Sequence, residues 1–420
     1  MKIRALTQFR SLAIDRKTKS LALASALAIV LGLTLLATPI AHAQTFSVLH
    51  NFTGGVDGSL PAAGVTIRGG TLYGATGYGG RYSWGVVYQA TRSRNNSWLV
   101  VPISYLPIRG YDPISRVLFG PDGRLYGTTT AGTPTFGTVY SLTPPASCIA
   151  VFCPWQQDEL HGFSGSPDGS MPGFGDLAWD KQGNIYGTTY WGGQNGVGVV
   201  YQLTPSGNGW TEAPIYSFLD RPDGAYPVGG IVVDGNGNLF GTTAWGGANN
   251  AGTVFELTYQ VGVGWKETIL HNFQWDDDGQ TPYGGLIFDN SGNLYGTTSG
   301  FSGMAGTVFE LSPSGNTWTF KRLSAFSGSG GCGPVNSLST DSAGNLYGTT
   351  NCDGAHGLGN VFKLTNTQNG WVYQSLYDFT GGADGFHPNG VVAIDTDGTI
   401  YGTATEGGSH AQGTLWMIKP

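Results

Sequence analysis

A unit of about 50 residues repeats seven times along this chain of 420 residues. Its most regular segment reads Asn-Leu-Tyr-Gly-Thr-Thr or a close variant. The aromatic residue of that segment recurs every 52 to 60 residues, at Tyr73, Tyr126, Tyr186, Phe240, Tyr295, Tyr347 and Tyr401. A repeat of this length is a supersecondary unit that must bury its apolar face against its neighbours. The chain is therefore predicted to form a propeller or a solenoid.

Each unit contains four short apolar segments separated by turn residues, and none of them has helical periodicity. In one unit these segments are residues 229–234, 238–243, 252–257 and 265–273. Runs of this kind between Gly, Asn and Asp are typical of antiparallel strands. Four strands per unit, repeated radially, predict the blades of a β-propeller. A solenoid is the alternative, but it needs polar capping repeats, and neither end of the array resembles one.

The two ends of the repeat array complement one another. The seventh unit stops at Pro420 after three expected strands, whereas residues 45–52 match the fourth strand at residues 266–273. An open ring would leave unpaired strand edges that favour aggregation. We therefore expect an all-β fold, a seven-bladed β-propeller of four-stranded antiparallel blades. Its N-terminal strand should pair with residues 413–419 and close the last blade.

The first 43 residues differ from the rest of the chain in composition. Their basic residues are Lys2, Arg4, Arg10, Arg16, Lys17 and Lys19. Residues 21–38 are almost wholly apolar, and Ala41-His42-Ala43 fits a cleavage site. This pattern predicts a secretory signal peptide over residues 1–43, followed by one propeller domain over residues 44–420. A retained membrane anchor is the alternative, because the apolar run approaches the length that spans a bilayer.

Removal of this leader makes the chain strongly acidic. The leader holds six of the 20 Lys and Arg residues and one of the 27 Asp and Glu residues, which leaves 14 and 26, a net charge of −12. Such a surface repels phosphate backbones, so we expect no nucleic-acid partner. We expect a secreted or otherwise extracytoplasmic monomer with no membrane attachment after cleavage. A polysaccharide and another envelope protein are the candidate partners.

Four cysteines in an exported chain predict two disulfides. Cys148 and Cys153 lie close together in the longest unit. Cys332 and Cys352 lie in two loops that should open on the same face of the sixth blade. We therefore expect the pairs Cys148–Cys153 and Cys332–Cys352. No Cys-x-x-Cys pair occurs, so neither a zinc site nor a thioredoxin-like site is predicted.

An Asp-x-x-Gly motif recurs between the first two strands of a unit, as at Asp234–Gly237. It suits a type I turn followed by a left-handed residue. The sequence Asp-Gly-Asn-Gly-Asn at residues 234–238 also resembles the start of a calcium loop. It lacks the glycine and the glutamate that an EF-hand needs at its sixth and twelfth positions, so turn formation is the preferred interpretation.

Three histidines, His50, His161 and His271, share one position of the fourth strand. The other units are aligned there with Ser217, Ala325 and Asp378. The histidines belong to different blades, so we expect them far apart around the ring. We therefore predict no metal site and no cofactor.

Two families of loops should emerge on one face of the ring. One joins each blade to the next and carries Asp-Gly, and the other carries Gly-Gly after the second strand. The candidate ligand-binding residues in these loops are Tyr78, Trp191, Trp245, Asp168, Asp223 and Asp278. An acidic pocket rimmed by aromatic rings would suit a sugar or a cation. The alternative is that Asp-Gly only forms turns and the rings only pack between blades.

The sequence contains none of the common catalytic signatures: His-Glu-x-x-His, Gly-x-Ser-x-Gly, a Walker loop or a dinucleotide fingerprint. No catalytic residue can be named, although carboxylates could still converge at the channel as glycosidases require. The favoured hypothesis is a secreted scaffold that binds carbohydrate or another partner at the channel mouth. An extracellular polysaccharide hydrolase or lyase and a structural envelope protein are the alternatives.

The repeat resembles the Gloeo–Verruco (GloVer) tandem repeat of exported bacterial proteins. Residues 180–204, 234–258, 289–312 and 341–365 carry the pattern Asp-x-x-Gly-Asn-Leu-Tyr-Gly-Thr-Thr, then Gly-Gly and Gly-Thr-Val-Phe-x-Leu-Thr, with weaker copies elsewhere. The resemblance implies an extracytoplasmic location and no assigned reaction. Some members of that family carry a C-terminal sorting anchor. This chain ends in Leu-Trp-Met-Ile-Lys-Pro, so surface anchoring is not expected. The turn also resembles, more distantly, the sensor propellers of two-component regulators.

Overall fold

The computed structural model describes residues 44–420, apart from residues 149–152, 208, 276–277, 301–305, 316 and 327–332. Thr45–Lys419 form one compact unit, whose described part consists of strands, turns and loops. No helix in the described residues is long and apolar enough to cross a membrane. Residues 1–43, to which the signal-peptide prediction refers, lie outside the described residues.

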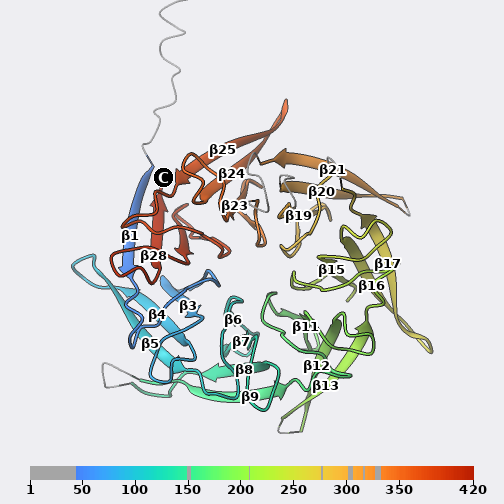
Figure 1. The fold of residues 1–420 in the computed structure, drawn as a ribbon, viewed down its shortest axis with the longest axis horizontal. Coiled ribbons are helices and arrows are strands. Elements are labelled where there is room, and N and C mark those ends of the chain that lie inside the picture. The colour runs from blue at the N-terminus through green and yellow to red at the C-terminus, as the bar shows by residue number, and fades with distance from the viewer. Residues whose placement is uncertain are drawn as a thin grey trace, which may run out of the picture. The chain divides into compact units, whose positions relative to one another are not determined.

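The strands form seven four-stranded antiparallel sheets, which are arranged as blades around a central axis (Figure 1). The innermost strands are β2 (Val65–Arg68), β6 (Leu118–Phe119), β10 (Ala178–Trp179), β14 (Val232–Val233), β18 (Ile287–Phe288), β22 (Ser339–Thr340) and β26 (Ala393–Ile394). The second strands are β3 (Thr71–Thr76), β7 (Leu125–Thr129), β11 (Ile185–Thr189), β15 (Leu239–Thr243), β19 (Leu294–Thr298), β23 (Leu346–Thr350) and β27 (Ile400–Ala404). The predicted all-β, seven-bladed propeller is confirmed.

The two outer positions of each blade are occupied by longer strands. The third strands are β4 (Val86–Arg92), β8 (Thr138–Thr143), β12 (Val199–Ser206), β16 (Thr253–Gln260), β20 (Thr307–Ser314), β24 (Asn360–Thr367) and β28 (Thr414–Lys419). The fourth strands are β5 (Trp98–Tyr105), β9 (Gln156–Gly162), β13 (Gly209–Ser217), β17 (Gly264–Asn272), β21 (Thr317–Ala325), β25 (Gly370–Asp378) and β1 (Thr45–Asn51). Blades are numbered from 1, which holds β2 to β5, to 7, which holds β26, β27, β28 and β1.

Strand β1 is the outer strand of blade 7. It pairs antiparallel with β28, from Thr45 opposite Lys419 to Asn51 opposite Thr414. It also contacts both neighbouring blades. Phe46 stacks on Tyr377 of blade 6 with 3.7 Å between ring centroids, and the buried Phe52 packs against Tyr88 of blade 1.

The glycine of the Leu-Tyr-Gly segment is required by packing inside each blade. A Cβ atom on Gly241 would lie 2.6 Å from the ring of Phe255, far inside van der Waals contact. The same relation holds in the other blades between Gly74 and Tyr88, Gly127 and Tyr140, Gly187 and Tyr201, Gly296 and Phe309, Gly348 and Phe362, and Gly402 and Trp416. An aromatic ring of the third strand therefore covers a second-strand position that only glycine can occupy.

The aromatic residue before that glycine is buried in six of the seven blades, and Phe240 is as buried as the tyrosines. In blade 1 the equivalent Tyr73 is partly exposed. Several of these tyrosines reach back to the Asp-x-x-Gly turn: the hydroxyl of Tyr186 donates to Asp180 at 2.9 Å, and that of Tyr347 donates to Asp341 at 2.8 Å. Phe240 cannot form this bond and is nevertheless buried, so packing is the main role of this position.

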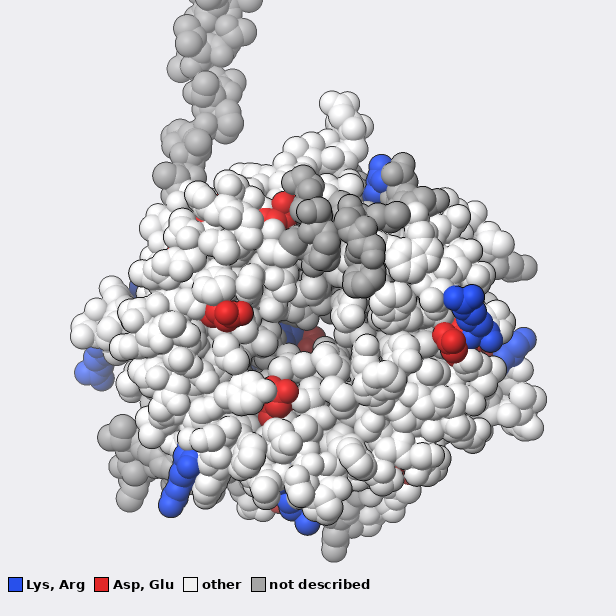
Figure 2. Space-filling view, viewed as in Figure 1, with Lys and Arg blue, Asp and Glu red and all other residues white. Residues whose placement is uncertain are grey.

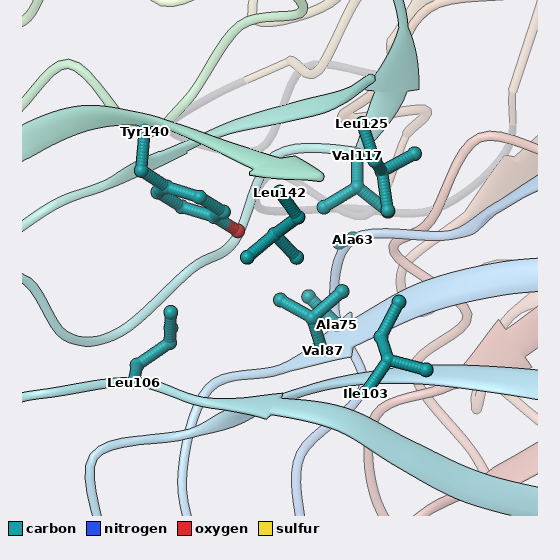
Figure 3. Close-up of a cluster of buried hydrophobic side chains, with 9 residues drawn as sticks. All are labelled: Ala63, Ala75, Val87, Ile103, Leu106, Val117, Leu125, Tyr140 and Leu142. Atoms are coloured by element: carbon teal, nitrogen blue, oxygen red, sulfur yellow. The ribbon is translucent and has the colours of Figure 1, made fainter. Parts of the chain in front are cut away.

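The hydrophobic core is divided into seven clusters, each shared by two neighbouring blades. Figure 3 shows the cluster between blades 1 and 2, in which Val87 and Ile103 face Leu125 and Leu142. Because every blade contributes to two clusters, burial of apolar surface holds the ring together from blade to blade.

The two loop families lie together on one face, as predicted. Isolated bridges join Ser170 to Trp191 and Ala225 to Trp245, which links each connector between blades to the Gly-Gly loop of the blade that it enters. We call this the connector face. Antiparallel pairing places the Asp-x-x-Gly turns and the hairpins between third and fourth strands at the opposite ends of the strands, on what we call the turn face.

The disulfide Cys148–Cys153 is confirmed, with 5.8 Å between the two Cα atoms. It lies in the connection between β8 and β9, on the turn face. Cys352 is also disulfide-bonded, whereas Cys332 lies outside the described residues.

The pairing Cys332–Cys352 therefore stays a prediction. Peptide mapping under non-reducing conditions should recover these two cysteines in one linked fragment. The loop that this bond closes would stabilise the fold by roughly 3 kcal/mol in the chain-entropy model. A fragment that links Cys352 to Cys148 or Cys153 would contradict the assignment of loops to faces.

Removal of residues 44–52 should destabilise the propeller and expose the edge of β28. We expect a loss of about 3 kcal/mol or more, because removing even one buried phenylalanine such as Phe52 costs that much. The exposed edge should also promote association between molecules. Thermal unfolding and size-exclusion chromatography measure the two effects.

Tyr259→Ala is the control, because Tyr259 is 62% exposed and should change stability little. If the shortened protein stays monomeric and melts at the wild-type temperature, β1 does not stabilise the ring.

Candidate functional site

The aspartates predicted as ligands tie the end of a fourth strand to the connector that follows it. Asp168 is 3.0 Å from His161 Nε2 and accepts a hydrogen bond from the backbone of Ser164 at 3.1 Å. Asp223 accepts from the Tyr216 hydroxyl at 2.7 Å and from the backbone of Leu219 at 2.9 Å. Both carboxylates are buried beneath the connector.

Asp278 makes the same arrangement, with 2.8 Å to His271 Nε2 and 3.0 Å to the backbone nitrogen of Gln274. His50 and Asp57 repeat it in blade 7, at 2.9 Å. The three histidines are thus on separate blades, as expected, and each is paired with the aspartate of its own connector.

The predicted alignment of the histidine position with Ser217, Ala325 and Asp378 is wrong by one residue. Strand pairing places Ser104, Tyr216, Ser324 and Tyr377 at the same position as the histidines. Successive residues of a strand point to opposite faces of the sheet, so the residue one step further along cannot take the same role. Tyr377 accordingly donates to Asp384 at 2.9 Å.

Two of the three predicted aromatic residues belong to a larger group on the connector face. Trp191, which is 40% exposed, lies edge-on to Tyr226 at 4.7 Å between ring centroids. Tyr226 stacks on Tyr190 at 5.1 Å. Trp245 is half-buried and lies 5.9 Å from Trp275 in the next connector.

Tyr283 connects the group around Trp191 with the pair formed by Trp245 and Trp275. It forms a hydrogen bond with the side chain of Trp245. Burial, and to a smaller extent the hydroxyls of Tyr283 and Tyr226, raise the pKa of Tyr190. We call the set that crosses blades 3 to 5 the aromatic arc: Tyr190, Trp191, Tyr226, Trp245, Trp275 and Tyr283.

Tyr78 belongs to a different group, at blades 1 and 2. It is 49% exposed, and the nearby carboxylate of Asp112, followed by burial, raises its pKa. Trp84 and Tyr111 lie beside one another in the same region, at 4.7 Å. The structure therefore brings together Trp191 and Trp245 but leaves Tyr78 in a separate group.

Four residues of the arc were not predicted from the sequence: Tyr190, Tyr226, Trp275 and Tyr283. Tyr190 and Trp275 have no counterpart in most units. Tyr226 has a positive φ of 57°, in a connector where other blades carry Leu60, Met171 or Thr281 with the same conformation. The available signal was the clustering of aromatic residues in consecutive units at positions that the repeat does not fix.

The central channel is lined by the innermost strands. Figure 2 shows the opening at the centre of the ring. A cavity of about 360 Å³ lies among β6, β10, β14 and β18, with mainly apolar walls that include Trp179 and Phe288. Among its described lining residues, Asp176 is the one carboxylate, and Arg116 Nε donates to it at 2.9 Å. The described lining of this cavity therefore holds no second carboxylate.

Two glutamates face connector aspartates across blade interfaces. Glu212 of β13 lies beside Asp168, and Glu267 of β17 lies beside Asp223. Burial, followed by the neighbouring aspartate, raises the pKa of Glu212 to about 7 and that of Glu267 to about 8. The Tyr216 hydroxyl lies 3.3 Å from Glu267 Oε2. In both glutamates the buried Oε1 atom lacks a hydrogen-bond partner in the described part of the chain.

A family model described as the Gloeobacter/Verrucomicrobia repeat matches residues 156–319 and 263–420. No curated protein matches the chain. The regular repeat of the sequence is thus the feature that relates it to other proteins.

Solved structures resemble the chain only distantly. A putative gluconolactonase is 13% identical, with a TM-score of 0.40, and the match covers 72% of this chain and 87% of that one. A putative oxidoreductase (glucose dehydrogenase) from Thermus thermophilus is 15% identical, with a TM-score of 0.44 and coverages of 72% and 95%. A glucose dehydrogenase is 12% identical, with a TM-score of 0.46 and coverages of 90% and 99%. No activity is transferred from these structures.

The raised pKa of Glu267 predicts a pH-dependent stability. Between the unfolded value of 4.5 and the folded value of about 8, the folded state holds a proton that the unfolded state releases. The free energy of unfolding should therefore fall as the pH rises through this window. Glu267→Gln cannot ionise, so its melting temperature should fall less than that of the wild type between pH 5 and pH 9.

Glu310→Gln, on the third strand of blade 5, is the control and should follow the wild-type curve. Parallel curves for wild type and Glu267→Gln would show that Glu267 ionises freely in the folded protein.

Proposed function

This chain belongs to the Gloeobacter/Verrucomicrobia repeat family, and we propose that it is an exported β-propeller that binds carbohydrate on its connector face. The aromatic arc is the observation that carries this proposal. It offers two well-exposed indole rings, Trp191 at 40% and Trp275 at 38%, on a rigid scaffold. Flat apolar rings with a polar edge suit the faces of sugar rings, whose hydroxyls need hydrogen-bond partners at the rim.

The extent of the arc favours an extended ligand. Its residues come from loops of three consecutive blades, so a chain of several sugar units could contact more than one ring at a time. Tyr190 and Tyr226 pack against Trp191, and their hydroxyls add polar groups to the arc. Tyr78 and its neighbours at blades 1 and 2 form a second aromatic group on the same ring.

The connector aspartates stabilise the loops that carry these aromatic rings. Asp168 and Asp223 are occupied by bonds to a fourth-strand side chain and to connector backbone, so they hold the loops in place. In this proposal they position the aromatic rings, and the rings themselves contact the ligand.

An extracytoplasmic location is part of the proposal. The leader over residues 1–43 has the composition of a secretory signal. The Cys148–Cys153 disulfide is compatible with an oxidising compartment. Binding of a glycan outside the cell agrees with both features.

Trp191→Ala combined with Trp275→Ala should remove binding without unfolding the protein. We expect at least a tenfold loss of affinity, since loss of about 1.4 kcal/mol already has that effect. A glycan array identifies the ligand, and calorimetry with the best glycan gives the affinity. Far-UV circular dichroism and melting curves check the fold.

Tyr259→Ala is the matched control, because this exposed aromatic residue lies near the hairpin on the turn face. Unchanged glycan binding by the double tryptophan variant, or no binding by the wild type across the array, would reject the proposal in favour of a structural role.

A further inference from the structure

Three potential metal ligands meet at the interface of blades 2 and 3. His161 comes from β9, Asp168 from the connector and Glu212 from β13 of the next blade. One ligand atom of each lies within 4.8 Å of those of the other two. His161 and Asp168 are seven residues apart and meet locally, whereas Glu212 belongs to the next blade, so it is the ring arrangement that brings Glu212 to the pair.

This combination is specific to one interface in the described part of the ring. The His–Asp pair occurs three times, but next to His271 the facing residue is Phe320, which stacks on the imidazole at 4.2 Å. In blade 1, which follows His50, the equivalent residue of the fourth strand is Val100. The next interface has a glutamate, Glu267, but Tyr216 in place of histidine.

In the described residues, the carboxylates at this interface have His161 as their one possible counterion, which is charged only when it is protonated. Neither Asp168 nor Glu212 forms an ion pair with an arginine or lysine of the described residues. Glu212 Oε1 is buried and lacks a described hydrogen-bond partner. Such an arrangement of facing carboxylates is costly unless a cation or a proton compensates it. At the neighbouring interface the Tyr216 hydroxyl lies between the two acids, 2.7 Å from Asp223 and 3.3 Å from Glu267.

The ligand side chains are held in place by other contacts. The Ser164 hydroxyl donates to Asp168 Oδ1 at 2.7 Å, which leaves Oδ2 directed at His161. The imidazole of His161 packs edge-on against the buried ring of Phe163, at 4.7 Å. Preorganised ligands with such supporting contacts are typical of metal sites.

We propose that His161, Asp168 and Glu212 bind a divalent transition-metal cation, of which Zn²⁺ is the representative probe. One imidazole nitrogen and two carboxylate oxygens form a ligand set that Zn²⁺ accepts, with a fourth position left for water or another ligand. The cation would join blade 2 to blade 3. This site differs from the expectation of no metal. It shares Asp168 with the connector that pairs with Trp191, but its test needs no glycan.

The test is calorimetric titration of the chelator-treated, purified protein with Zn²⁺. The wild type should bind one equivalent saturably, and binding should raise the melting temperature because the ion prefers the folded state. Glu212→Gln, which keeps the shape of the side chain, should weaken binding at least tenfold. His161→Gln should have a similar effect.

Two variants serve as matched controls. Glu267→Gln removes the equivalent glutamate of the next interface, and His271→Gln removes the equivalent histidine of blade 4, so both should bind Zn²⁺ as the wild type does. X-ray absorption of the Zn²⁺ complex should show one imidazole and oxygen ligands. Absence of saturable binding by the wild type, or equal loss in Glu212→Gln and His271→Gln, would overturn the proposal.

Discussion

The contact between a second-strand glycine and a third-strand aromatic ring determines how each blade is built. No side chain fits between the two strands at this point, because a Cβ atom on Gly241 would overlap the ring of Phe255. The ring can therefore lie over the inner part of its own sheet and pack against the phenylalanine that follows the fourth strand of the preceding blade, as Phe255 packs against Phe218. Seven repetitions of this pair produce seven similar blades, and similar blades can share seven similar clusters of buried side chains.

Most of the fold could be predicted from the sequence because its determinants repeat. Period and strand pattern agree in every unit and the Asp-x-x-Gly turn recurs in five of them, so an error in one copy is corrected by the others. The match between residues 45–52 and residues 266–273 pointed to the outer strand of blade 7 for the same reason. Register is less accessible: the alignment of His161 with Ser217 was wrong by one residue, and because successive residues of a strand face opposite sides of the sheet, that shift assigned the wrong side chain to the position.

The candidate sites depend on positions that the repeat leaves free. One position of the fourth strand faces the preceding blade, and its side chain differs from blade to blade. From blade 7 through blades 1 to 6 it is Phe46, Val100, Gln157, Glu212, Glu267, Phe320 and Tyr373. No pattern within one unit reveals that Glu212 meets His161, because the contact joins two units. The aromatic arc also extends beyond one blade, since Trp275, in the connector that follows blade 4, lies beside Trp245 of that blade. Contacts within each blade thus determine the scaffold, whereas the residues of the candidate sites meet between blades.

The pairing of β1 with β28 has a consequence for the order of assembly. Thr45 and Lys419 are partners although nearly the whole described chain separates them. The N-terminus of a chain is synthesised first, so β1 emerges before β28. Intermediate blades can form as each emerges, because their strands are neighbours in sequence. Blade 7, however, cannot be completed before β28 has emerged, so β1 must wait for its partner, and loop closure over this distance is slow. Until then, β1 is the segment with the greatest need for protection from other chains.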